Sequence, residues 1–224
     1  MSLLTNILAY WKFDESSGNA SDATGNGYTL TNNAGVTYSA AVINNGANFA
    51  SASTQYFNST AAGLGLVASD FTIAFWIKPV SLAVYNSIIT KYTGGSFGYN
   101  IWADGGGVGL IIGSTNVSFT ARPGLSTSAF THIVITQSGT SVVIYKNGSS
   151  FGTGTGASVP SSSADFQIGL TSSYGTPMNG VMDETGIWTR ALSAGEVSTL
   201  YNSGHGLQYP FGGSGNASFL MNFL

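Results

Sequence analysis

The chain has 224 residues and very little charge, with 6 Lys and Arg, 9 Asp and Glu, a net charge of −3 and a charged fraction of 7%, against about 25% in an average domain. Six scattered basic residues form no surface for phosphate groups, which argues against a nucleic-acid partner, and no apolar run is long enough to span a bilayer. Cysteine is absent, which excludes disulfides and thiolate metal sites.

The N-terminal part of the chain has the pattern of a strand followed by turns. Residues 7–13 (ILAYWKF) alternate, with Ala9, Trp11 and Phe13 on one face, which predicts a half-buried strand. Turn-forming Asp, Asn, Ser and Gly dominate residues 14–27, and short strands are expected at 28–30, 44–49 and 55–58. The opening MSLLTNILAY lacks both a basic segment and a small-residue cleavage site, so we expect no signal peptide.

The middle of the chain predicts a succession of strands. The clearest is 69–80 (SDFTIAFWIKPV), in which Phe71, Ile73, Phe75 and Ile77 share one face. Glycine-rich turns separate further strands, which are expected at 87–92, 98–102, 109–112 and 117–120. Residues 131–137 and 141–146 predict a hairpin, Asn147-Gly148 is typical of a type I′ turn, and another strand is expected at 165–170.

The stretch 179–204 combines one more strand with the clearest helix in the sequence. Strict alternation over 181–189 predicts Val181, Asp183, Thr185 and Ile187 on one face and Met182, Glu184 and Trp188 on the other. Ser193 and Glu196 then form a capping box at the start of a helix. Its apolar stripe is Val197, Leu200 and Tyr201, and Gly204 is expected to end it in the left-handed conformation.

Many short strands with turns between them, followed by one short helix, indicate an all-β fold. We predict a two-sheet antiparallel jelly-roll sandwich with a short helix near the C-terminus. Residues 1–211 would form a single domain and 212–224 a glycine-rich linker with an apolar tail. That tail, FLMNFL, requires a groove in its own chain or in a neighbour.

Four stretches in order carry a family resemblance: YWKFDESSGNASDATGNG, DFTIAFWIKP, GTSVVIYKNG and NGVMDETGIWTRALSAGEVSTLYNSG. From about Leu8 to Gly206 the chain resembles the laminin G-like (LamG), concanavalin A-like jelly-roll family, and most closely its bacterial and phage branch. The resemblance implies two antiparallel sheets packed face to face. The family includes lectins, carbohydrate-binding modules, adhesion modules and some glycosidases, so the fold alone does not decide the function.

The resemblance also implies a structural calcium ion, which in many members sits where the loop after the first strand meets the acidic strand near the end. Carried over residue by residue, the expected ligands are Asp22, Asn26 and Asp183, with Asp14 and Glu184 as weaker candidates. Calcium prefers such carboxylate and amide oxygens. The alternative is that Asp22 and Asn26 only order their own turn and that Asp183 caps a loop.

Carbohydrate binding is the second expected kind of site. Sugars bind to exposed aromatic rings beside amides and hydroxyls, and the candidates in or beside glycine-rich loops are Tyr92, Tyr99, Trp102 and Tyr174. The alternative for each ring is a place in the core. We expect no enzyme, because neighbouring carboxylates such as Asp183 and Glu184 point to opposite faces of a strand and form no glycosidase pair.

Two functions remain open from the sequence. One is a non-enzymatic adhesion or binding module of a phage virion, as a head-decoration or tail-associated protein that also binds glycans. The other is a secreted bacterial carbohydrate-binding module or lectin. The expected partners are glycans or cell-surface polysaccharide, together with neighbouring capsid or tail proteins, or further copies of the chain, that the C-terminal tail contacts. The expected location is the virion surface or the extracellular space.

Overall fold

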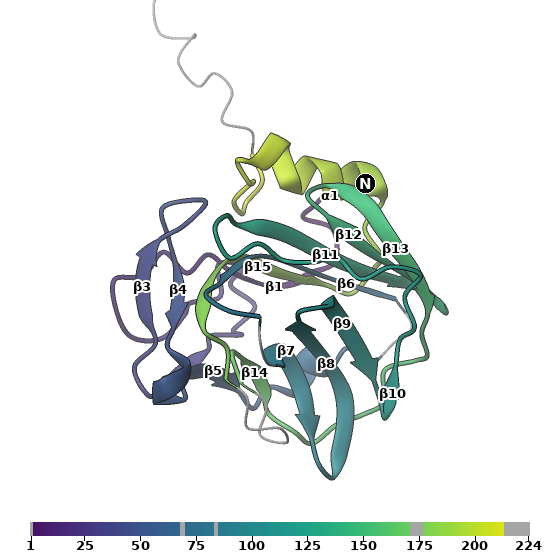
Figure 1. Cartoon of the computed structure of the whole chain (residues 1–224), viewed down its shortest axis with the longest axis horizontal. Helices are drawn as coiled ribbons and strands as arrows, with labels where there is room; N and C mark the ends of the chain where they lie inside the picture. The colour runs from purple at the N-terminus through teal and green to yellow at the C-terminus, as the bar shows by residue number, and fades with distance from the viewer. Residues whose placement is uncertain (1, 68–69, 83–84, 171–176, 213–224) are drawn as a thin grey trace, which may run out of the picture.

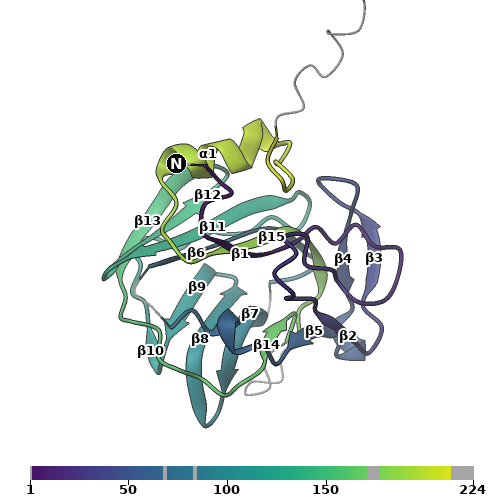
Figure 2. The ribbon, with the colours of Figure 1, turned by 180° about the vertical axis from the view of Figure 1, so that it is seen from behind.

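The structure, a computed structural model, describes residues 2–67, 70–82, 85–170 and 177–212. These residues form two antiparallel sheets packed face to face (Figures 1 and 2). Sheet I has the order β13 (Ser149–Thr155), β12 (Ser141–Lys146), β11 (Thr131–Ser138), β6 (Phe71–Pro79), β15 (Gly180–Trp188), β4 (Asn45–Phe49) and β3 (Thr37–Ala40), with β1 (Ile7–Trp11) also paired to β15. Sheet II has the order β10 (Thr115–Asn116), β9 (Gly107–Ile112), β8 (Ser96–Asp104), β7 (Asn86–Thr93), β14 (Phe166–Ile168), β5 (Tyr56–Ser59) and β2 (Thr31–Asn33).

The helices are few and short. Helix α1 (Ala194–Tyr201) lies on the outside of sheet I, as Figure 1 shows. Three 3-10 turns complete the described elements: η1 (Ser51–Ser53), η2 (Ala62–Gly65) and η3 (Asn202–Gly204). No helix in the described ranges is both long and apolar enough to cross a membrane. The prediction of an all-β sandwich with one short C-terminal helix is confirmed.

The main core lies between the sheets, as the alternation in the sequence predicts. The inward side of β6 buries Phe71, Ile73 and Phe75, and β1 contributes Trp11. A second, smaller cluster lies on the outer side of sheet I, where Val197 and Leu200 of α1 cover Ala74, Val134 and Trp188. Helix α1 is therefore stabilised by docking, as expected for a helix of only two turns.

Strand β15 departs from the predicted alternation. Met182 and Ile187 were placed on opposite faces, yet both lie in the core between the sheets. The register of β15 against β6 shifts between Asp183 and Gly186, and Glu184 has φ of 47°. The prediction of strict alternation is therefore wrong here, because a β-bulge resets which residues face inward.

The helix begins as predicted and ends earlier. Ser193 and Glu196 form the capping box, and Glu196 also pairs with Arg190 at 2.6 Å, which lowers the pKa of its carboxyl to about 2. The first left-handed residue is Asn202, with φ of 48°, rather than Gly204. Asparagine tolerates this conformation, and its side-chain amide donates to the carbonyl of Gly206.

Smaller differences concern strand boundaries. Asn45 and Gly46 lie inside β4, and the turn before it is closed by the amide of Ala41 donating to the carbonyl of Asn44. The strand expected at 117–120 is replaced by β10 at Thr115–Asn116. Strand β3 was not predicted, because its residues TYSA show no apolar alternation. The predicted apolar tail falls within 213–224, outside the described residues, so its role stays a prediction.

The bulge in β15 generates a test of the outer packing of sheet I. A Cβ on Gly186 would lie 2.6 Å from the ring of Trp188 and 2.8 Å from that of Tyr10, and both rings are buried. We expect Gly186→Ala to lower the free energy of unfolding by about 1–3 kcal/mol through overpacking. Gly195→Ala is the matched control, because nothing lies within 4 Å of that position. Urea denaturation should leave the control unchanged or slightly stabilised; equal effects would refute the packing argument.

Candidate functional site

The four aromatic residues predicted to bind sugar occupy different environments. Tyr99 is fully buried and donates its hydroxyl to the carbonyl of Leu64 at 2.8 Å. Its ring is not available to a ligand, and the expectation of an exposed ring is not met there. Tyr92 is 7% exposed and packs against Phe97. Trp102 is half-buried on the outer side of sheet II, and Tyr174 lies outside the described residues.

The three predicted calcium ligands form hydrogen bonds to different parts of the chain. Both carboxylate oxygens of Asp22 accept hydrogen bonds from its own loop and its neighbours: the amides of Tyr10, Thr24 and Tyr28 and the hydroxyl of Thr24. The Asn26 amide donates to the carbonyls of Ile7 and Leu8. These contacts are the ones expected if Asp22 and Asn26 order their own turn.

Asp183 caps a different loop. Its Oδ2 accepts from the amides of Val42 and Ile43 at 3.0 Å each, and its Oδ1 is buried without a hydrogen-bond partner. Within the described ranges, no three His, Asp or Glu side chains are grouped so that they could hold a metal ion. Calcium binding by Asp22, Asn26 and Asp183 therefore stays a prediction.

The bulge turns Glu184 under the C-terminal segment, where Gln208 links it to Asp14. Glu184 accepts from the Tyr10 hydroxyl at 2.5 Å and from the Gln208 amide at 2.8 Å. The same Gln208 nitrogen donates to Asp14 at 2.8 Å. This network fastens residues 205–211 to sheet I, and its inner member Glu184 is only 3% exposed.

Burial controls the ionisation of the neighbouring carboxyls of Asp183 and Glu184. Burial raises the pKa of Asp183 to about 8, against the amides of Ile43 and Val42, which lower it. Burial likewise raises the pKa of Glu184 to about 7, although the hydrogen bonds from Tyr10 and Gln208 oppose the shift. Both groups hold a proton more tightly in the folded chain than in the unfolded chain.

A cluster around Trp102 is the most distinctive polar site outside the core. It comprises Tyr85, Ser87, Asn100, Trp102 and Arg122, and we call it the Trp102 cluster. Strand β8 places Asn100 and Trp102 outward because Tyr99, Ile101 and Ala103 point into the core. Ser87 of β7 is the direct cross-strand partner of Trp102.

The Trp102 ring is held in place from several sides. Tyr85 stacks on it at 4.8 Å between centroids, and the Arg122 guanidinium lies 4.3 Å from its centroid. A Cβ on Gly109 would come within 2.6 Å of the ring, so only glycine fits beneath it. Arg122 is itself fixed by an ion pair with Asp104 at 2.6 Å.

Three polar atoms of the cluster are buried without a hydrogen-bond partner: Ser87 Oγ, Asn100 Oδ1 and Trp102 Nε1. Each such atom costs on the order of 1–3 kcal/mol, and clusters of them call for a water, an ion or a ligand. They combine a hydroxyl, a carbonyl acceptor and an N–H donor beside aromatic rings. Ser87 and Asn100 are 0% exposed, so the part of the cluster that can meet a ligand is the half-buried pair of rings, Tyr85 and Trp102.

Sequence reasoning found Trp102 and missed the other members of the cluster. The outward position of Ser87 could not be predicted, because the register of β7 against β8 shifts between Ser87 and Ile89. As a result, Ile88 and Ile89 both enter the core. Arg122 is 20 residues from Trp102 in the sequence, and no local pattern connects them. The polar Asn100 between two core residues was the one available signal.

The comparisons with known proteins agree with this architecture. A family model described as the concanavalin A-like lectin/glucanases superfamily matches residues 51–198, more than half of the chain. The chain therefore belongs to that superfamily. No curated protein matches the chain.

Several solved structures share the fold. Domain 4 of AbnA, an extracellular arabinanase from Geobacillus stearothermophilus solved with arabinotriose, is similar with a TM-score of 0.67 and 20% identity, over 86% of this chain and 97% of that one. The binding domain of Paraclostridial Mosquitocidal Protein 1 has a TM-score of 0.73 and 19% identity, over 90% and 53%. The receptor binding domain of a botulinum neurotoxin of mosaic serotype C/D has 0.69 and 15%, over 90% and 51%. The chain thus spans about half the length of these two toxin domains.

The raised pKa of Glu184 predicts that the stability of the fold depends on pH. Because the folded chain raises the pKa of Glu184 from 4.5 to about 7, unfolding releases a proton, and its contribution to stability is complete below about pH 4.5 and lost as pH rises through about 7. Two other buried groups titrate nearby: His132, whose pKa is lowered to about 3 by burial, adds a rise up to about pH 6.5, and Asp183, whose pKa is raised to about 8 by burial, adds a fall. Both groups are present in the parent and in a Glu184 variant.

We therefore expect Glu184 to contribute a fall in the free energy of unfolding between about pH 4.5 and 7. Glu184→Gln keeps the shape of the side chain and removes the titrating proton, so its curve should be flatter over this range. Chemical denaturation across the pH series measures both proteins. A variant with the same slope as the parent would show that Glu184 is ionised in the folded chain.

Proposed function

We propose that this chain is a non-enzymatic carbohydrate-binding module acting at an outer surface, with the Trp102 cluster as part of its binding site. The observation that carries the proposal is the stacked pair of half-buried rings, Tyr85 and Trp102, beside sheet II. Sugar rings present apolar C–H faces, which suit Tyr85 and Trp102.

The charge of the site favours a neutral saccharide. Arg122 is paired with Asp104 and also donates to the carbonyl of Gly107, so the guanidinium charge is balanced within the chain. The Trp102 cluster contains no further ionisable group except the Tyr85 phenol. The arabinotriose in the AbnA domain 4 structure is a neutral oligosaccharide on the same fold, which supports this ligand class.

The arrangement of the acidic groups supports a binding role over a catalytic one. A glycosidase needs two carboxyl groups that reach the substrate from opposite sides of the scissile bond. Here Asp183 and Glu184 are closed to solvent, and Asp22 and Asp14 accept hydrogen bonds that order loops. Asp14 and Glu184 are bridged by the side-chain amide of Gln208.

We place the module on a virion surface, as a head-decoration or tail-associated protein of the bacterial and phage branch. The support is sequence-based: the few basic residues available to trypsin-like proteases, and the apolar FLMNFL behind a glycine linker, which can add to a neighbouring subunit. A secreted bacterial carbohydrate-binding module or lectin is the alternative.

Deletion of the C-terminal tail distinguishes a virion protein from a secreted module. Deleting residues 218–224 should abolish self-association or docking on capsid or tail proteins if the tail is an anchor, and leave sugar binding intact. Analytical ultracentrifugation of the full chain and of the truncated chain measures the first effect. Identical sedimentation, alone and with virion proteins, would favour the secreted module.

The sugar-binding proposal is tested on an array of neutral and acidic glycans, with and without chelator. We expect neutral glycans to be bound. For the best of them Trp102→Ala should weaken binding by at least about tenfold, equal to 1.4 kcal/mol. Gly109→Ala keeps the indole and displaces it, so it should weaken binding as well.

The control is Phe151→Ala, which removes a ring that is 44% exposed on β13 of the other sheet. It should bind as the parent does, and calorimetry on folded protein supplies the affinities. Binding that survives both Trp102→Ala and Gly109→Ala would move the site elsewhere, and an array without signal would overturn the proposed function.

A further inference from the structure

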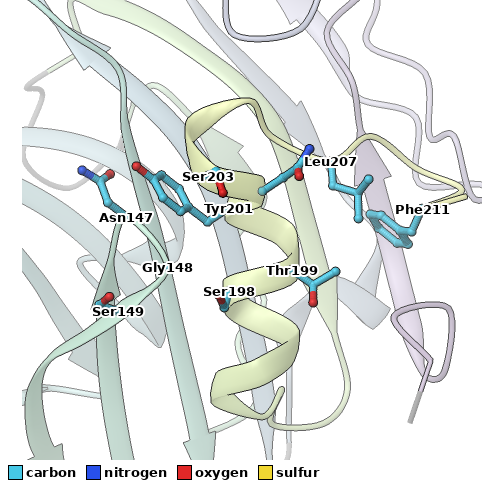
Figure 3. A pocket seen from close by; sticks show the side chains of 10 residues that line it. Asn147, Gly148, Ser149, Ser198, Thr199, Tyr201, Ser203, Leu207 and Phe211 are labelled. Carbon is cyan, nitrogen blue, oxygen red and sulfur yellow. The ribbon is translucent and has the colours of Figure 1, made fainter. Parts of the chain in front are cut away.

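A second polar groove lies on the opposite side of the sandwich. It has a volume of about 700 Å³ and runs along α1. One wall is the turn between β12 and β13, with Asn147 and Ser149, and the other is the helix with Ser198 (Figure 3). In Figure 3 the Tyr201 side chain extends from the helix toward Asn147, so the two walls approach each other there.

The aromatic ring in the groove is fixed before any ligand arrives. Tyr201 stacks on Trp76 with 5.6 Å between centroids and an interplanar angle of 23°, and Trp76 in turn lies 4.8 Å from His132. A Cβ on Gly148 would approach the Tyr201 ring to 2.8 Å, so the glycine of the turn fits closely against it. A preformed site loses little entropy on binding.

Among the described residues the lining is mostly polar, with Leu207 and Phe211 as its aliphatic and phenyl members, and it carries no charged side chain. Ser149, Ser198 and Ser203 present hydroxyls that have no hydrogen-bond partner in the described part of the chain. Asn147 uses its side-chain oxygen for the amide of His132, which leaves its NH2 group for a ligand. No Asp, Glu, Lys or Arg lines the groove, so it offers nothing to pair with a phosphate, a carboxylate or a cation.

We propose that this groove is a second saccharide site, which takes a neutral oligosaccharide. Hydroxyls and an amide on two walls, beside a half-buried ring, match the hydroxyl rim and apolar face of a sugar. The class of ligand rests on the proposed function, whereas the location is independent of it. Helix α1 covers sheet I, and β8, which carries Trp102, belongs to sheet II on the other side of the sandwich (Figure 1). The two sites therefore face away from each other, and one chain can join two glycan strands.

The test is an NMR titration of the isotope-labelled full chain with neutral trisaccharides, arabinotriose and maltotriose, in millimolar excess. We expect two separate sets of amide shifts, one around Ser198 and Asn147 and one around Trp102. Ser198→Trp fills the groove from an exposed helix position and should remove the first set alone. Ser149→Tyr fills it from the opposite wall and serves if the helix variant fails to fold. Gly195→Ala, on the same helix and away from the groove, should keep both sets.

The outcomes separate the two proposals. Shifts at the Trp102 cluster alone would overturn the second site and retain the proposed function. Shifts at the groove alone would retain the second site and overturn the Trp102 location. With shifts at both, the parent chain should cross-link a neutral polysaccharide in light scattering and Ser198→Trp should not. An absence of shifts anywhere would overturn both.

Discussion

The break in the register of β15 between Asp183 and Gly186 determines how the outer side of sheet I is organised. Without it, Met182 and Ile187 could not both enter the core. With it, Glu184 is turned under the C-terminal segment, where Tyr10 and Gln208 hold it. The bulge therefore couples the middle of the sandwich to residues 205–211, which in turn complete the cover over Trp188.

Helix α1 depends on the same region. Trp188, directly after the bulge, donates its indole N–H to the carbonyl of Leu3 and packs in the cluster that contains Val197 and Leu200. The helix is too short to persist alone, and its position comes from this apolar contact and from the Arg190–Glu196 pair. The groove beside Tyr201 exists because the helix is held at a fixed distance from the β12–β13 turn.

Local patterns in the sequence predicted the elements that depend on residues close together in the chain. The alternation of Phe71, Ile73 and Phe75 and the capping box of Ser193 and Glu196 were both confirmed. A bulge has no such signature, because the register depends on the partner strand; hence the errors at β15 and the missed Ser87. For the candidate site, Trp102 could be selected as an aromatic beside glycines, whereas its contact with Arg122 comes from tertiary packing.

The few charged residues of the chain mostly form contacts within the fold. All nine acidic residues lie in the described part of the chain, and each accepts at least one hydrogen bond from within it. Among the basic groups, Arg122 and Arg190 form ion pairs and Lys91 donates to the carbonyl of Ala164. The fold thus uses its charged groups for internal order and presents hydroxyls, amides and aromatic rings to its surroundings. Recognition by such a surface depends on hydrogen bonding and shape more than on Coulomb attraction, so we expect it to be weakly screened by salt and to favour neutral partners, in line with the proposed function.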